Sequence, residues 1–254
     1  MMGMRRIIQQ LTPPAIAWRL GRARREREEL AKFQAFYRGF LQPGDLCFDI
    51  GANLGNRLRC FRSMGCRVVA LEPQSWCFER LKRGFGEDPE VVLIQAAAGA
   101  APGSAQLRIS PDHVLSTLSS DFIEETRASG RFSAARWDRS EEVVMTSLDR
   151  LIDAHGMPAF VKIDVEGFES EVLAGLSRPV PALSIEWVPE LAGNARRCLD
   201  RLEALGDYEY QISWGESMRF ARSEWRSPAS LRVVIDELEG ESHLFGDIYA
   251  RVRR

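Results

Sequence analysis

The sequence has no long apolar run, little net charge and few cysteines. Five cysteines occur in 254 residues; the number is odd and no two form a C-x-x-C pair, so neither a disulfide framework nor a zinc site is expected. No apolar stretch approaches the roughly 20 residues that span a bilayer, and the N-terminus lacks the apolar core of a signal peptide. The net charge of −2 attracts neither nucleic acid nor an anionic membrane. We therefore expect a cytoplasmic protein without a transmembrane segment or a nucleic-acid partner.

The composition is that of a soluble globular protein, with 45% hydrophobic and 28% charged residues. A chain of this length can bury one sizeable core. Apolar residues at helical spacing in residues 1–43 predict an N-terminal helical extension, which ends at a Pro-Gly-Asp turn. Residues 44–254 are expected to form a single domain.

Short apolar runs alternate with helical patterns after this turn, which predicts an α/β fold with a doubly wound, mostly parallel sheet. The expected strands are residues 46–50, 67–71, 91–95, 159–164, 182–186, 208–213 and 248–252. Residues 99–146 interrupt the alternation and are expected to add two strands, 105–109 and 142–146, around a polar loop without an assigned structure. His113 lies in this loop and is expected to be solvated, although a histidine can also serve as a base.

A glycine turn follows the first strand and reads D-x-G-x-x-x-G from Asp49 to Gly55. Glycines there let the backbone turn sharply and approach a ligand, at the strand ends where α/β sheets bind ligands. The G-x-G-x-x-G fingerprint of dinucleotide sites is absent, because Asn53 stands where a middle glycine is common. Asp49 disfavours a diphosphate and suits an amine-bearing ligand. We predict that Asp49, Gly51, Asn53 and Gly55 bind such a cofactor.

The next two strands end in further candidate cofactor ligands. Glu72 ends the second strand, 21 residues after Gly51, where a carboxylate can accept hydrogen bonds from both ribose hydroxyls. Gln95 ends the third strand and is expected to reach the edge of an adenine. Ala96 beside it leaves room for the ring.

An acidic cluster follows the fourth core strand. Asp164 and Glu166 are expected at the same sheet edge as the glycine turn, and Glu186 ends the neighbouring strand. Carboxylates that are forced together raise one another's pKa, which produces a candidate general base, and they equally suit a divalent cation. Lys162, unusual in an apolar strand, is expected to pair with one of them.

With these motifs the chain resembles the FkbM-type methyltransferases, which use S-adenosylmethionine. The matching stretches are residues 48–55, 70–73, 146–149, 161–169 and 172–175. The resemblance implies a Rossmann-like class I methyltransferase fold, whose sheet has seven strands with the last antiparallel. It also implies O-methylation of a hydroxyl on a sugar, glycan or secondary metabolite, so that the partner is a small-molecule or glycan acceptor.

Two other functions use the same sheet. A nucleotide- or NAD-dependent enzyme is disfavoured by the missing fingerprint, and a non-catalytic cofactor-binding module is disfavoured by the acidic cluster. The identity of the acceptor, the participation of a metal and the formation of a homo-oligomer stay open. Residues 1–43 and 214–230 match no motif, and acceptor selection is expected there.

Overall fold

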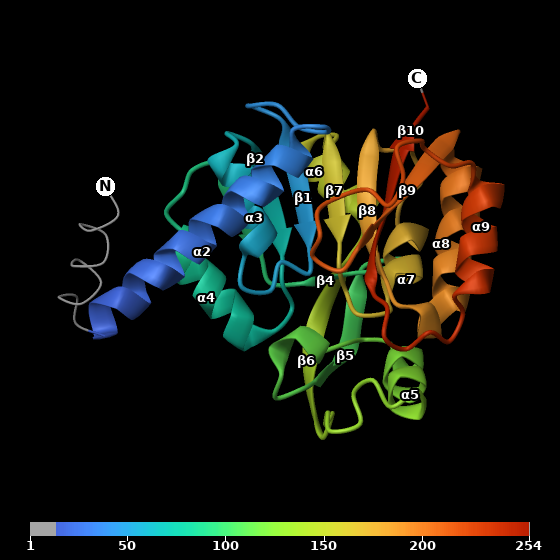
Figure 1. Cartoon of the computed structure of the whole chain (residues 1–254), viewed down its shortest axis with the longest axis horizontal. Coiled ribbons are helices and arrows are strands. Elements are labelled where there is room, and N and C mark those ends of the chain that lie inside the picture. The colour runs from blue at the N-terminus through green and yellow to red at the C-terminus, as the bar shows by residue number, and fades with distance from the viewer. Residues whose placement is uncertain (1–13, 254) are drawn as a thin grey trace, which may run out of the picture. The chain divides into compact units, whose positions relative to one another are not determined.

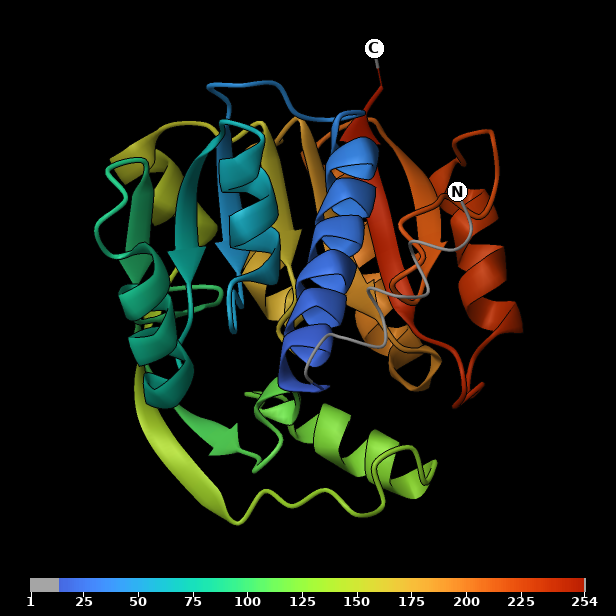
Figure 2. The same ribbon diagram turned by 60° about the vertical axis from the view of Figure 1, so that its left-hand side comes forward.

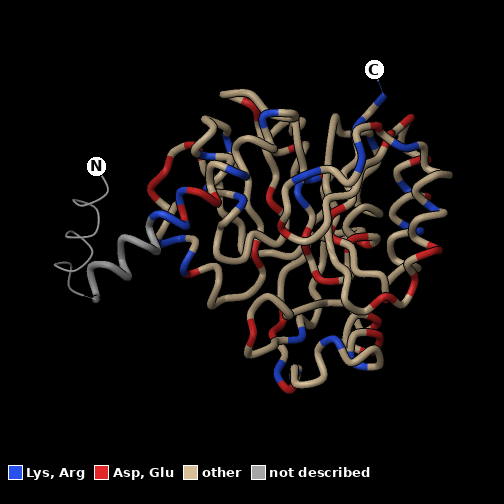
Figure 3. The backbone as a smooth tube through the Cα atoms, in the orientation of Figure 1, with Lys and Arg blue, Asp and Glu red and all other residues tan. Residues whose placement is uncertain are grey.

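The computed structural model describes residues 14–253, so predictions for residues 1–13 lie outside the described part. The chain divides into two compact units, one that ends at Gly39 and one that begins at Phe40. The first contains the helix α2 (Pro14–Tyr37), along which basic and acidic residues are mixed from residue 24 onward (Figure 3). No helix between residues 14 and 253 has the length and apolar character to cross a membrane. The predicted domain limits stay a prediction.

The second unit is built on a seven-stranded sheet with the order β3-β2-β1-β7-β8-β10-β9 (Figure 1). The strands are β1 (Leu46–Ile50), β2 (Arg67–Leu71), β3 (Val91–Ile94), β7 (Phe160–Ile163), β8 (Ala182–Trp187), β9 (Tyr208–Trp214) and β10 (Gly246–Val252). β10 pairs antiparallel with both β8 and β9, and the pairs among β3, β2, β1, β7 and β8 are parallel. The predicted fold class is confirmed, including the antiparallel last strand.

Helices cover both faces of this sheet (Figure 2). They are α3 (Asn56–Ser63), α4 (Ser75–Phe85), α6 (Leu148–His155), α7 (Glu169–Ala174), α8 (Ala192–Leu205) and α9 (Pro228–Glu237). Buried residues of α6, α7, α8 and α9 pack in one cluster with Phe48 and Ile50 of β1 and with Val161 of β7. Side chains alternate across a strand, so Asp49 and Lys162 lie on the other face, against which α3 packs.

A small three-stranded sheet lies below the main sheet in Figure 1. Its strands β4 (Ala97–Ala98), β5 (Gly103–Ile109) and β6 (Arg139–Thr146) have the order β4-β6-β5, and β5 and β6 pair antiparallel. The polar loop between β5 and β6 contains a 3-10 turn (His113–Leu115) and the helix α5 (Ser120–Ala128), which the sequence did not predict. Ser119 caps α5 by accepting a hydrogen bond from the backbone N–H of Phe122.

Candidate functional site

A pocket of about 230 Å³ opens where β1, β2 and β7 end. Side chains from both sheets line it, which is the usual place for a ligand in an open α/β sheet. Of the predicted site residues, it is lined by Asp49, Gly51, Asn53, Glu72, Ala96, Asp164 and Glu166. Gly55, Gln95 and Glu186 do not line it.

The glycine turn brings two strand ends into close contact. Gly51 has a φ of +80°, and a Cβ atom there would lie 1.9 Å from the carbonyl oxygen of Asp164. Only glycine lets the end of β1 approach the end of β7 this closely. Gly55 was predicted to bind the cofactor, but it packs against α4 instead. A Cβ atom at Gly55 would lie 2.8 Å from Leu81 and 2.9 Å from Phe85. Its role is the tight packing of α3 on α4, which keeps it out of the pocket lining.

The Glu72 carboxylate is held by the backbone at both oxygens. Asn53 N–H donates to Oε2 at 2.8 Å and Gln74 N–H donates to Oε1 at 2.8 Å. The residue is 2% exposed, and burial raises its pKa to about 7 against these hydrogen bonds. A carboxylate fixed in this way keeps free lone pairs for donors that enter the pocket.

Asp49 presents an unpaired oxygen to the pocket. It is 2% exposed, and its Oδ2 has no hydrogen-bond partner within residues 14–253. Burial raises its pKa to about 6, although the positive charges of Lys162 and Arg57 act in the opposite direction. A buried carboxylate oxygen without a donor is unfavourable. It is therefore the atom of this pocket that most needs a ligand with a positively charged N–H group.

The apolar end of the pocket differs from the prediction. The Gln95 side chain donates to Ser75 Oγ at 3.0 Å and stays outside the lining, which corrects its predicted position at the pocket. Ala96 lines the pocket, as do Ala97, Ala98, Leu107 and Leu118. These small and apolar side chains leave space for a flat ring.

Gln74 lines the pocket although the sequence did not single it out, and His113, which was expected to be solvated, lines it as well. The side chain of Gln74 donates to the backbone oxygen of His113 at 2.9 Å, and both residues line the pocket. The His113 ring stacks on Trp76 with centroids 5.3 Å apart. The loop of the small sheet is thereby fixed against the first turn of α4, so His113 is not the solvated residue that was expected.

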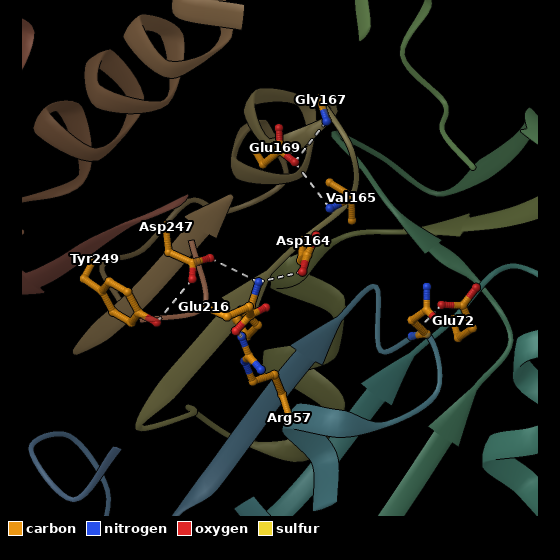
Figure 4. Close-up of polar contacts among 11 residues, drawn as sticks. Arg57, Glu72, Asp164, Val165, Gly167, Glu169, Glu216, Asp247 and Tyr249 are labelled. Carbon is orange, nitrogen blue, oxygen red and sulfur yellow. Dashed lines mark hydrogen bonds and ion pairs between the residues drawn. The ribbon is translucent and has the colours of Figure 1, made fainter. Parts of the chain in front are cut away.

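Lys162 forms ion pairs with two carboxylates, Asp164 and Asp247, both of which are labelled in Figure 4. Its Nζ lies 2.8 Å from Asp164 Oδ2 and 3.3 Å from Asp247 Oδ1, and its side chain is 2% exposed. Burial alone would lower the pKa of Lys162, but the two carboxylates raise it well above its usual value. The predicted pairing of Lys162 within the acidic cluster is confirmed. Asp247, contributed by β10, was not predicted.

The three predicted carboxylates converge as expected. Single oxygens of Asp164, Glu166 and Glu186 all lie within 4.8 Å of one another. Burial would raise the pKa of Asp164, but the Lys162 ammonium holds it below its usual value. Burial and the negative charge of Asp164 raise the pKa values of Glu166 and Glu186 well above theirs. The charge of Lys162 thus favours the ionised form of Asp164, whereas burial and the charge of Asp164 favour the protonated forms of Glu166 and Glu186.

The turn that carries this cluster is fixed from two sides. Glu166 has a φ of +54°, which is unfavourable for a residue with a side chain. Its backbone oxygen accepts a hydrogen bond from Thr117 Oγ1 at 2.7 Å. The Glu169 carboxylate accepts from the N–H groups of Val165 at 3.3 Å and Gly167 at 3.1 Å (Figure 4). Strained backbone that is held by its surroundings is typical of functional sites.

Comparison with family models identifies the domain. The methyltransferase FkbM domain model matches residues 49–212, which include the glycine turn, Glu72 and the acidic cluster. The chain belongs to the FkbM methyltransferase family. The family uses S-adenosylmethionine as methyl donor, so the predictions of family and cofactor are confirmed. The family assignment also disfavours the NAD-dependent alternative.

One curated relative of this FkbM domain is the hexuronic acid methyltransferase AglP of Haloferax volcanii. The two are 27% identical over 154 residues, which cover 60% of this chain and 58% of AglP. The matched region thus spans less than two thirds of that relative.

Solved methyltransferase structures are also similar. Precorrin-6Y C5,15-methyltransferase of Geobacter metallireducens is 13% identical with a TM-score of 0.45, over 90% of this chain and 87% of that one. A methyltransferase of Thiobacillus denitrificans in complex with S-adenosyl-L-homocysteine is 12% identical with a TM-score of 0.42, over 89% of this chain and 91% of that one.

The residues of the FkbM pocket fit S-adenosylmethionine. The molecule has an ammonium group that needs an acceptor, and Asp49 has a buried oxygen without a donor. Its ribose hydroxyls need acceptors, and Glu72 lies in the same pocket. The pocket thus contains the two carboxylates that the cofactor requires. The roles of individual residues stay predictions.

Proposed function

We propose that the protein transfers the methyl group of S-adenosylmethionine to a hydroxyl of a sugar or glycan. One observation carries the proposal: Asp49, Glu72 and the ionised Asp164 line a single pocket. The first two suit the cofactor, and the third suits removal of a proton from the acceptor. The hexuronic acid methyltransferase among the relatives supports a sugar as acceptor.

We assign the following roles to the residues of the pocket. Asp49 accepts hydrogen bonds from the ammonium group, Glu72 accepts them from the ribose, and the alanines of β4 adjoin the adenine. Bound S-adenosylmethionine supplies an electrophilic methyl group on a sulfonium sulfur. Asp164 would accept the hydroxyl proton as the acceptor oxygen takes the methyl group, and the electron pair of the broken S–C bond would stay on sulfur. Alignment of the reacting atoms can supply about 7–11 kcal/mol of the acceleration.

A transfer assay tests the proposal. The full chain is incubated with S-adenosylmethionine that carries a labelled methyl group and with a panel of neutral and acidic sugars. Label in a product that resists mild alkali indicates a methyl ether, as expected for transfer to a hydroxyl. An alkali-labile methyl ester would contradict the O-methylation of a hydroxyl, and no transfer to any sugar would contradict the acceptor class.

Cofactor affinity is expected to fall at acidic pH. The buried carboxylates of Glu72 and Asp49 have pKa values raised to about 7 and about 6. Both bind the cofactor in the ionised form, so binding is strongest above both pKa values and is lost as each group gains a proton. Calorimetric titration should show the affinity falling about tenfold per pH unit between 7 and 6 and more steeply below 6. The steeper part should disappear in Asp49→Asn, and a pH-independent affinity in the native protein would contradict these roles.

Turnover is expected to persist without a divalent metal. Three carboxylates within 4.8 Å could hold a cation, but the Lys162 ammonium already neutralises Asp164 at 2.8 Å. We therefore expect the initial rate to change less than about twofold after dialysis against EDTA, with S-adenosylmethionine saturating. A rate that collapses and is recovered with Mg²⁺ or Mn²⁺ would assign the cluster to a metal instead.

A further inference from the structure

An ion pair lies at the same end of the pocket as Asp164. The guanidinium of Arg57, in the first turn of α3, donates to Glu216 Oε2 at 2.7 Å. Both residues line the pocket, and Glu216 belongs to the segment after β9 in which acceptor selection was expected. In Figure 4 the pair lies on the side of Asp164 and apart from Glu72, and the charge of Arg57 acts on the pKa values of both Lys162 and Asp164. The pair therefore lies on the side of the proposed base Asp164 rather than on that of the proposed ribose ligand Glu72.

The two partners of this pair differ in their exposure to water. The Arg57 side chain is 11% exposed, whereas the Glu216 side chain is 59% exposed. Glu216 follows Gly215, which has a φ of +49° in the turn after β9. Water around the exposed Glu216 carboxylate weakens its attraction to the guanidinium. A second carboxylate can therefore compete with Glu216 for the guanidinium.

The neighbouring charges also favour an acidic acceptor. Lys162 is held by Asp164 and Asp247, whereas the Glu216 carboxylate that Arg57 contacts is largely exposed to water. The planar guanidinium matches a carboxylate with two parallel hydrogen bonds. A carboxylate bound there would place the adjoining part of the same molecule near Asp164.

We propose that Arg57 binds a carboxylate of the acceptor, which displaces Glu216, so that the acceptor is an acidic sugar with a hydroxyl directed at Asp164. This inference rests on the proposed function and refines it. Glu216 serves as an internal substitute that holds the guanidinium in place until the acceptor arrives. It also repels an acceptor carboxylate, so its removal strengthens binding.

Opposite effects of two variants test this assignment. Initial rates and titrations use the full chain with S-adenosylmethionine or S-adenosyl-L-homocysteine, and methyl glucuronide or methyl glucoside as acceptor. Arg57→Gln should raise the KM for the glucuronide about 10- to 100-fold, as expected for a lost charged hydrogen bond, and should leave the KM for the glucoside within about twofold. Glu216→Gln should lower the KM for the glucuronide. Arg59→Gln, an exposed residue of the same helix, is the matched control.

Other outcomes separate this inference from the proposed function. If Arg57→Gln and Glu216→Gln impair both acceptors alike, the pair is a structural brace and the inference is wrong. Equal KM values for glucuronide and glucoside in the native protein, or no binding of the glucuronide, overturn it as well. The proposed function is judged separately, by methyl transfer to any sugar of the panel.

Discussion

Replacing Asp164 by asparagine is expected to lower kcat by about 10²- to 10⁴-fold, the usual contribution of a general base. The variant keeps the shape of the side chain but cannot accept the acceptor's proton. Its neighbours Glu166 and Glu186 are poor replacements, because burial and the nearby negative charges raise their pKa values and disfavour the ionised form that a base needs. The dissociation constant of S-adenosylmethionine should stay within about threefold. Stopped-time transfer assays at saturating cofactor and calorimetric titration measure the two quantities.

Asp247→Asn is the matched control for this variant. Asp247 also pairs with Lys162, at 3.3 Å, but it does not line the pocket. Both substitutions remove one counter-charge from a buried lysine, and both should lower the free energy of unfolding. Only Asp164→Asn should also lower kcat by about 10²- to 10⁴-fold. Equal losses of kcat in the two variants would mean that charge balance, and not proton removal, is the role of Asp164.

Replacing Glu72 by alanine is expected to weaken the binding of S-adenosylmethionine by about 10²- to 10⁴-fold, because two charged hydrogen bonds to the ribose are worth about 1.5–3 kcal/mol each. The substitution also removes the acceptor of the N–H groups of Asn53 and Gln74, so the glycine turn loses its support. At saturating cofactor the kcat should change far less than the dissociation constant.

Glu72→Gln separates these two effects. Glutamine keeps one oxygen for the backbone N–H groups but removes the charge. The dissociation constant of S-adenosylmethionine should therefore lie between that of the native protein and that of Glu72→Ala. Titration of S-adenosyl-L-homocysteine, which has the same ribose, should give the same order. An unchanged dissociation constant in Glu72→Ala would show that this carboxylate does not contact the cofactor.

Sequence patterns predicted which strand ends and acidic residues form the site, because each of these features is local in the chain. β1 and β2 are adjacent and parallel in register, with Asp49 opposite Ala70, so the acidic residues near their ends meet at one edge. The same reasoning brought Asp164, Glu166 and Glu186 together. Apolar runs, turns and strand ends are local features, and local features are visible in a single sequence.

The features of the site that the sequence did not predict depend on contacts between distant segments of the chain. Glycine is equally compatible with a ligand and with a tight helix contact, and only the positions of Leu81 and Phe85 assign Gly55 to the second. Gln95 turns to Ser75 because α4 begins beside it. Arg57 and Glu216 meet across the fold, and no spacing along the chain signals such a pair.

The position of β10 in the sheet has a consequence for the folding of this protein during its synthesis on the ribosome. β10 lies between β8 and β9 and brings Asp247 to the buried ammonium of Lys162. Until residue 252 has left the exit tunnel, β9 has no place in the sheet and the lysine lacks one of its two counter-ions. The nascent chain can thus pair β1, β2, β3, β7 and β8 first, whereas the edge of the sheet with β9 and β10 forms only after β10 has emerged.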